Sequence, residues 1–351
     1  MRVSGPATIS LPPAPLSAAD AVPLFATLAG AKALLVAVSG GPDSIALLAL
    51  LAEWAARPGR PPLHAATVDH GLREASLAEA RAVGTLCARL GIPHAVLTWE
   101  GPKPETGIQA RARAARYELL AGESARLGGA VVVTAHTLDD QAETLLMRMA
   151  HGSGPSGLAG MRPRVSRGQV EIARPLLAIR KCRLVATAQA RGLPFVEDPS
   201  NANRRFERVR WRALMPTLAE SGLDAGRLGQ LASRIGRLEE AVAERARKVW
   251  SDVALEDVGT SRVAIRFRDL LQEPEEIALR VVSHALDRVA GERLARLERL
   301  ETCLAAMREA AREGRRLTRT LAGCMLVLGR DGTLTCGREP ERKRGIHPAP
   351  S

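Results

Sequence analysis

Short apolar stretches alternate with longer amphipathic stretches along the first two-thirds of the chain. The short stretches have the length and composition of buried strands, and strands are expected at 33–38, 63–68, 94–98 and 130–135. The longer stretches place apolar residues three and four positions apart, and helices are expected at 43–56, 74–90, 108–127 and 138–150. A further strand and helix are expected within 170–191. Repeated strand–helix units predict an α/β fold, a doubly wound parallel sheet covered on both faces.

The last third of the chain has a different pattern, and we expect a boundary near Pro216–Gly222. Two Arg/Glu-rich stretches predict long helices at 224–249 and 291–316. Two apolar stretches predict short strands at 262–268 and 324–336. We therefore expect a smaller, mainly helical C-terminal domain. The expected division is a flexible arm over 1–25, a first domain over 26–217, a second over 218–337 and a basic tail over 338–351.

The first expected strand runs directly into the loop Ser39-Gly40-Gly41-Pro42-Asp43-Ser44 and then into an apolar helix. Two glycines let the backbone turn sharply and approach a ligand, because no Cβ stands in the way. Pro42 suits the first turn of a helix, where an N–H is not needed. The N–H groups and positive dipole end of that helix favour an anion such as phosphate.

The loop lacks the Gly-Lys-Ser/Thr ending of the ordinary P-loop. It resembles instead the pyrophosphate loop of the ATP pyrophosphatases, which join the α-phosphate of ATP to a substrate oxygen and release pyrophosphate. The alternative is a glycine-rich turn that binds nothing.

Polar residues also follow two other expected strands, at the edge of the sheet where α/β proteins bind ligands. Asp69 and His70 follow the second strand, where either could contact a nucleotide or Asp69 could simply cap a helix. The fourth strand leads into the segment His136-Thr137-Leu138-Asp139-Asp140-Gln141-Ala142-Glu143-Thr144. Asp140 and Glu143 share a helical face there and could hold Mg²⁺ or an ammonium group. Helix capping would account for one of the acids only.

Arginines are concentrated at two places. Arg113 and Arg116 are three residues apart on an expected helix, where they could bind phosphate or lie on a solvated face. The turn Asp198-Pro199-Ser200-Asn201 is followed by Arg204, Arg205, Arg208, Arg210 and Arg212. Such a dense cationic patch suits phosphate clamping or stabilisation of charge that develops during adenylyl transfer.

The chain carries 50 Lys and Arg against 38 Asp and Glu, a net charge of +12, which suits a polyanionic partner; a basic surface without a partner is the alternative, and charge alone does not separate them. Its five cysteines form no Cys-x-x-Cys pair, which disfavours disulfide frameworks and zinc ribbons and indicates a reducing, cytoplasmic setting. No apolar run reaches the roughly 18 residues of a membrane span. A homodimer is left open.

Several motifs together resemble the tRNA(Ile)-lysidine synthetases in order and spacing, over about residues 33–215. They are residues 39–44, Val68-Asp69-His70-Gly71-Leu72-Arg73, Ala112-Arg113 to Arg116-Tyr117, residues 136–144, Arg174-Pro175-Leu176-Leu177 and residues 198–201. The family usually ends this region with Arg-Asn-x-x-Arg, whereas Val209 stands in the Asn position here. Residues 218–351 match the family only loosely and look like its compact form.

The resemblance implies a two-step reaction with ATP, Mg²⁺, free L-lysine and an isoleucine tRNA that has a CAU anticodon. ATP adenylates O2 of the wobble cytidine, and the ε-amino group of lysine then attacks C2 and expels AMP. Residues 26–217 would be the catalytic domain and residues 218–337 a tRNA-binding domain.

The resemblance also implies roles for the residues singled out above. Ser39, Gly40, Gly41, Pro42, Asp43, Ser44, Asp69, His70 and Arg113 would bind the nucleotide. Asp43 would also hold Mg²⁺, Asp140 and Glu143 would bind the lysine, and His136 would position or deprotonate the amine. Arg208 or Arg212 would stabilise the adenylyl transition state, so the expected catalytic set is Asp43, His136, Asp140, Arg208 and Arg212.

Four other interpretations share parts of this pattern. Glutamine-dependent synthetases use the same loop but need a nucleophilic N-terminal Cys, and tRNA thiolases use it with paired cysteines; neither feature is found in this sequence. A catalytically dead RNA-binding protein would be expected to lack Asp43, Asp140 or Glu143, and all three are present. An AMP-forming small-molecule ligase stays open and would not require tRNA.

Overall fold

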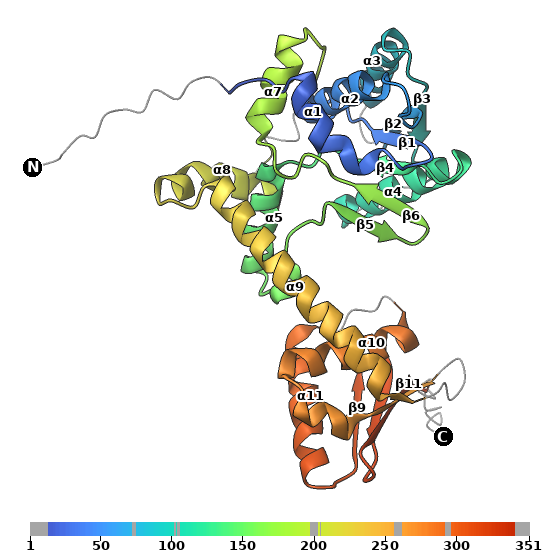
Figure 1. Cartoon of the computed structure of the whole chain (residues 1–351), viewed down its shortest axis with the longest axis vertical. Helices are drawn as coiled ribbons and strands as arrows, with labels where there is room; N and C mark the ends of the chain where they lie inside the picture. Colours follow the sequence, from blue (N-terminus) through green and yellow to red (C-terminus); the bar gives the residue numbers. More distant parts are fainter. Residues whose placement is uncertain are drawn as a thin grey trace, which may run out of the picture. The chain divides into compact units, whose positions relative to one another are not determined.

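The computed structural model describes residues 13–71, 75–101, 103, 106–196, 203, 205–255, 262–291 and 296–340. The chain divides into two compact units (Figure 1), one made of Met1–Gly152 with Gly157–Ser233 and the other of Ser153–Ser156 with Arg234–Ser351. The division falls inside the long helix α9 (Ala225–Val253). The segment 216–222, where the sequence predicts a boundary, forms the end of α8 (Glu207–Glu220) and the turn that follows it.

The first unit contains a six-stranded sheet in the order β3-β2-β1-β4-β6-β5. Its strands are β1 (Leu34–Ala37), β2 (Leu63–Asp69), β3 (His94–Thr98), β4 (Val131–Val133), β5 (Arg164–Arg167) and β6 (Val170–Ala173). All neighbours pair in parallel except β5 with β6. The predicted α/β fold with a parallel sheet is confirmed. The antiparallel edge strand β5 has no counterpart in the prediction, because all four of its residues are exposed and leave no apolar pattern.

Helices cover both faces of this sheet. They are α1 (Ala18–Phe25), α2 (Pro42–Ala55), α3 (Ala75–Arg89), α4 (Ile108–Arg126), α5 (Leu138–Ala150) and α7 (Lys181–Ala190), with α8 and the start of α9 completing the unit. Leu34 and Val36 of β1 pack with α1, α2, α3 and α7, while Leu35 packs with α4 on the other face. This alternation is what a strand buried on both sides requires.

The expected flexible arm over 1–25 is wrong for its C-terminal part. Ser17 caps α1 in a capping box with Asp20, and the side chains of Leu16 and Phe25 are almost completely buried. The prolines near the start suggest a loose segment, but this apolar surface packs against α2, with the Phe25 ring edge-on to Trp54.

A small apolar cluster positions α8 against α5. It is formed by Ala142, Leu145, Leu146, Ala225, Leu228 and Ala232, with Trp211, Met215 and Leu218 packed on it. Docking of α8 through this cluster brings its arginines to the acidic face of α5.

The second unit contains helices and a five-stranded antiparallel sheet in the order β7-β8-β11-β10-β9. Its strands are β7 (Ala254–Leu255), β8 (Arg262–Arg266), β9 (Leu317–Leu321), β10 (Cys324–Leu328) and β11 (Thr333–Arg338), and α10 (Glu275–Ala290) and α11 (Leu297–Arg312) pack with it. The expected strand at 324–336 is in fact a hairpin, because Gly332 takes a positive φ at its turn. The sheet is larger than the prediction of a mainly helical domain suggests.

Among the described residues, no helix is long and apolar enough to cross a membrane. All five cysteines are free thiols, and Cys182 is the exposed one.

Candidate active site

The loop between β1 and α2 is held in place by its own two serines. Ser44 Oγ donates to the Gly41 carbonyl at 3.0 Å and accepts from the Ser39 backbone N–H at 3.1 Å. Ser39 Oγ lies 3.2 Å from Ser44 Oγ. Gly40 has φ +82°, a left-handed conformation that glycine adopts without strain. No side chain caps α2, so the N–H groups of its first turn are left for an anion such as phosphate.

Three helices of the first unit begin at one place. The backbone N–H of Lys181, the first residue of α7, donates to Asp139 in the first turn of α5 at 2.7 Å. The Lys181 ammonium forms an ion pair with Asp43 in the first turn of α2. The first turns of α2, α5 and α7 therefore lie close together. The N-terminus of α2, which no side chain caps, favours an anion there.

The Asp43 carboxylate oxygen that does not contact Lys181, Oδ1, is suited to bind a cation. This oxygen is buried and has no hydrogen-bond partner among the described residues. Burial raises the pKa of Asp43, although the Lys181 ammonium counteracts part of this effect. The described part of the chain contains no group of three or more His, Cys, Asp or Glu that could hold a metal. A Mg²⁺ at Asp43 would take its other ligands from phosphate and water, as Mg²⁺ commonly does.

Asp140 and His136 lie together at the start of α5. Asp140 Oδ2 accepts from the backbone N–H and the hydroxyl of Thr137, each at 2.9 Å, so the capping role considered from the sequence is present. Burial raises the pKa of Asp140, but these bonds and the nearby Arg208 outweigh it and the net pKa is lowered. Burial lowers the pKa of His136 to about 4 against the attraction of Asp140. At neutral pH the site therefore contains a carboxylate beside a neutral imidazole.

Glu143 is already engaged by the two arginines predicted for the site. Its carboxylate accepts from Arg212 Nε at 2.7 Å and Nη2 at 3.1 Å, and Arg208 Nε lies 3.2 Å away. The Glu143 side chain is 2% exposed. Burial raises the pKa of Glu143, and the hydrogen bonds from Arg212 oppose this. The carboxylate of Glu143 thus binds α8 to α5 and orients both guanidinium groups.

Asp69 and His70 lie at the end of β2. Asp69 Oδ1 accepts from the Gly71 N–H at 2.8 Å and the Ser76 hydroxyl at 2.6 Å, which organises the turn. Arg116 Nη2 lies 3.2 Å from His70 Nε2. An arginine can only donate, so in the neutral ring Nδ1 carries the proton. That Nδ1 is buried without a partner among the described residues, which leaves one donor for a ligand.

The guanidinium of Arg113 lies over the Tyr117 ring, 5.3 Å from its centroid, and its charge acts on His136. Leu72 and Arg73 of the 68–73 motif, the turn 198–201 and Arg204 lie outside the described residues.

Two site residues, Arg174 and Lys181, are absent from the set predicted from sequence. Arg174 follows β6, is 8% exposed, and its Nε has no hydrogen-bond partner in the part of the chain that the structure describes. Its charge also acts on His136. The strand-end rule that selected Asp69 and His136 applies equally to Arg174, whereas only tertiary structure brings Lys181 to Asp43.

Comparison with known proteins agrees with this geometry. A family model described as a PP-loop domain matches residues 17–218. The tRNA(Ile)-lysidine synthase of Methylobacterium sp. (strain 4-46) is 48% identical over 317 residues, which cover 90% of this chain and 91% of that protein. The chain belongs to the tRNA(Ile)-lysidine synthase family.

Other members of the tRNA(Ile)-lysidine synthase family are similar over the same extent. The protein of Methylobacterium nodulans is 48% identical, covering 90% of this chain and 93% of its own. That of Rhodopseudomonas palustris is 45% identical, covering 94% and 97%. Among solved structures, the U34-tRNA thiolase NcsA from Methanococcus maripaludis matches with a TM-score of 0.54 and 19% identity, over 63% of this chain and 78% of that one. At this identity the match shows the fold alone.

Proposed function

We propose that this chain converts the wobble cytidine of a CAU-anticodon isoleucine tRNA to lysidine, with ATP and free L-lysine as the other substrates. The observation that carries the proposal is the uncapped N-terminus of α2 at the 39–44 loop, with the first turns of α5 and α7 and a carboxylate–imidazole–arginine cluster beside it. Relatives named tRNA(Ile)-lysidine synthase, similar over nearly the whole chain, support the choice of substrate.

The phosphates of ATP would lie against the 39–44 loop, where backbone N–H groups and helix dipoles stabilise their charge. Asp43 would hold Mg²⁺ through its unpartnered Oδ1, and the metal would supply positive charge that screens the phosphates. The proton on His70 Nδ1 and the guanidinium of Arg113 would contribute further nucleotide contacts.

In the first step, O2 of the cytidine bonds to the α-phosphorus and the bond to pyrophosphate breaks. Arg208 and Arg212 are well suited to stabilise the charge on the transferring group, because two guanidiniums share the single carboxylate of Glu143 and keep one net positive charge. Their side chains are 37% and 38% exposed, so they are open to an incoming phosphate.

In the second step, the lysine ε-ammonium loses a proton to solvent, its nitrogen bonds to C2 and the bond to AMP breaks. Asp140 is the better of the two acids for the lysine ammonium, since Glu143 is committed to the arginines. The low pKa of His136 makes it a weak general base at neutral pH. We therefore assign it the role of orienting the neutral amine through Nε2, since Nδ1 contacts the Thr134 hydroxyl.

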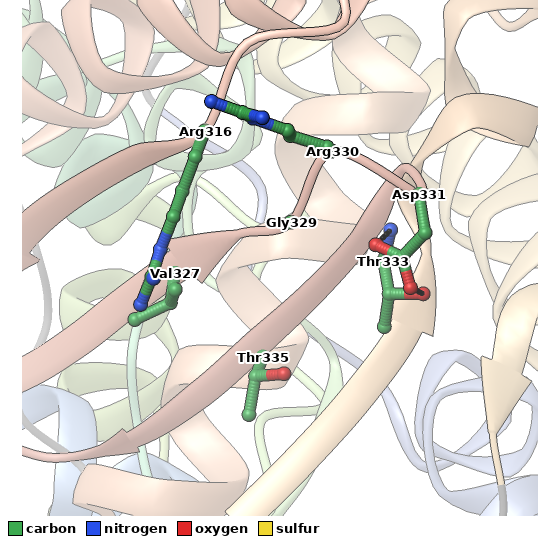
Figure 2. Close-up of a pocket in the computed structure, with 7 residues that line it drawn as sticks. All are labelled: Arg316, Val327, Gly329, Arg330, Asp331, Thr333 and Thr335. Carbon is green, nitrogen blue, oxygen red and sulfur yellow. Dashed lines mark hydrogen bonds between the residues drawn. The ribbon is translucent and has the colours of Figure 1, made fainter.

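The outer face of the second unit's sheet has the character of a surface for the tRNA backbone. A hollow of about 540 Å³ lies there, lined by Arg316, Val327, Gly329, Arg330, Asp331, Thr333 and Thr335 (Figure 2). Figure 2 shows the side chains of Arg316 and Arg330 along two sides of it. Neither guanidinium has an ion pair within the described ranges, whereas Asp331 accepts the Thr333 hydroxyl at 2.9 Å. Free guanidiniums beside hydroxyl groups are typical of phosphate contacts.

Two experiments test the proposal. Pyrophosphate release from ATP is expected to require the isoleucine tRNA but not lysine; release without RNA would favour a small-molecule ligase. For the second unit, the double variant Arg316→Ala, Arg330→Ala is expected to weaken tRNA binding roughly tenfold near 0.2 M salt and to reduce the salt dependence. Arg315→Ala is the matched control, because Arg315 is already paired with Glu313 at 2.8 Å. Equal binding by both variants would refute the surface.

A further inference from the structure

Both the backbone and the side chain of Lys181 bind acidic residues at the phosphate site. Its backbone N–H is fixed to Asp139 at 2.7 Å, which anchors the root of the side chain at the start of α7. Its ammonium forms an ion pair and hydrogen bond with Asp43. The Lys181 side chain is 40% exposed and that of Asp43 is 20% exposed. The ion pair is thus only partly removed from solvent.

We propose that Lys181 is a mobile phosphate ligand that occupies Asp43 before ATP binds and transfers to the pyrophosphate end of ATP afterwards. The inference rests on the use of ATP in the proposed function and adds a residue to it. Two cations, the Lys181 ammonium and Mg²⁺, would compete for the Asp43 carboxylate. The ammonium binds Oδ2, and Oδ1 is buried and without a partner among the described residues. With a divalent ion bound, the Asp43 carboxylate would attract the ammonium less strongly, because its charge would be partly neutralised.

Once released from Asp43, the ammonium would move to the phosphate groups of ATP. The uncapped N-terminus of α2 lies at the same loop as Asp43 and favours the phosphate groups there. The four-carbon stem of lysine is flexible and carries a compact charge, so the ammonium can move while the backbone of α7 stays fixed to Asp139. Since the side chain is already partly hydrated, the movement requires little additional desolvation.

The contribution to the reaction is electrostatic. As the bond between the α-phosphorus and the bridging oxygen breaks, negative charge grows on the leaving pyrophosphate, and the ammonium stabilises it. Lys181 forms no covalent bond and transfers no proton. Lys181 is therefore a ligand of the leaving group, and Asp43 binds its ammonium before ATP arrives.

The test uses the full chain without tRNA or lysine. Pyrophosphate binding is measured by calorimetry, and Mg²⁺ dependence by the thermal shift that Mg²⁺ with pyrophosphate produces. For Lys181→Gln, we expect the Kd for pyrophosphate to rise about tenfold, the size of one lost charge-assisted contact. The Mg²⁺ concentration for half the thermal shift is expected to fall, because the competing cation is gone. Lys181→Arg retains the charge and is expected to restore most of the binding.

Arg183→Gln is the matched control, because Arg183 lies two residues further along α7 and donates to the Ala14 carbonyl at 3.1 Å, outside the site. It should leave both values unchanged. If Lys181→Gln lowers the melting temperature but leaves pyrophosphate affinity and Mg²⁺ requirement as in the parent, the ion pair is only structural and the inference is overturned. A failure of the proposed function would appear instead as loss of the tRNA requirement for pyrophosphate release.

Discussion

The buried carboxylate of Glu143 gives the sharpest prediction. Glu143→Gln keeps the shape of the side chain but removes the charge that Arg208 and Arg212 share. Removing one partner of a buried ion pair costs about 3–5 kcal/mol, but here both arginines are more than one-third exposed and water can solvate them. We therefore expect a loss of about 2 kcal/mol in the free energy of unfolding, measured by urea denaturation. Glu171→Gln is the control: its pair with Arg164 is exposed, and we expect a change below about 1 kcal/mol.

The same variant separates two roles for Glu143. The family resemblance assigns Glu143, with Asp140, to the lysine ammonium, and that role predicts a higher KM for lysine with normal adenylation. The structure has its carboxylate on two arginines, so we expect the rate of tRNA adenylation without lysine to fall roughly tenfold to a hundredfold, as for the loss of one transition-state contact. Adenylation at the parental rate, with a raised KM for lysine, would refute our reasoning and restore the first role.

Two further predictions concern His136 and Asp43. The pKa of His136 falls from 6.5 to about 4, so the unfolded chain binds more protons between these values, and stability should rise with pH across that window by up to about 3 kcal/mol. His136→Asn should flatten this part of the urea-denaturation pH profile; an unchanged slope would contradict a buried neutral imidazole. Asp43→Asn should reduce pyrophosphate release about a thousandfold, because the carboxylate of the phosphate loop is lost. Release within tenfold of the parent would exclude Asp43 from the metal-binding role.

Local patterns in the sequence predict most of the catalytic domain's elements. The strands β1 to β4 and the helices α2 to α5 are apolar or amphipathic over the lengths expected, and their observed ends differ from the predicted ones by at most a few residues. The helical period also predicts that Asp140 and Glu143 share a face. Elements whose residues carry no such period, such as the exposed strand β5, are not predictable in this way.

The partners of the site residues are set by tertiary packing. Lys181 and Asp43 are 138 residues apart, and Arg212 and Glu143 are 69 residues apart. The sequence identifies all these residue types except Lys181 as chemically interesting, but the apolar cluster around Leu145 and Leu228 decides that α8 docks on α5. Whether Glu143 meets a substrate ammonium or two arginines depends on that docking.

The central claim is that this chain attaches lysine to the wobble cytidine. We would incubate it with ATP, Mg²⁺, labelled L-lysine and an unmodified CAU-anticodon isoleucine tRNA, with a methionine tRNA as the control, and map the label by nuclease digestion. The account predicts ATP-dependent incorporation at the wobble position of the isoleucine tRNA alone. Pyrophosphate release without any lysine in that tRNA would contradict it and direct the search to another acceptor.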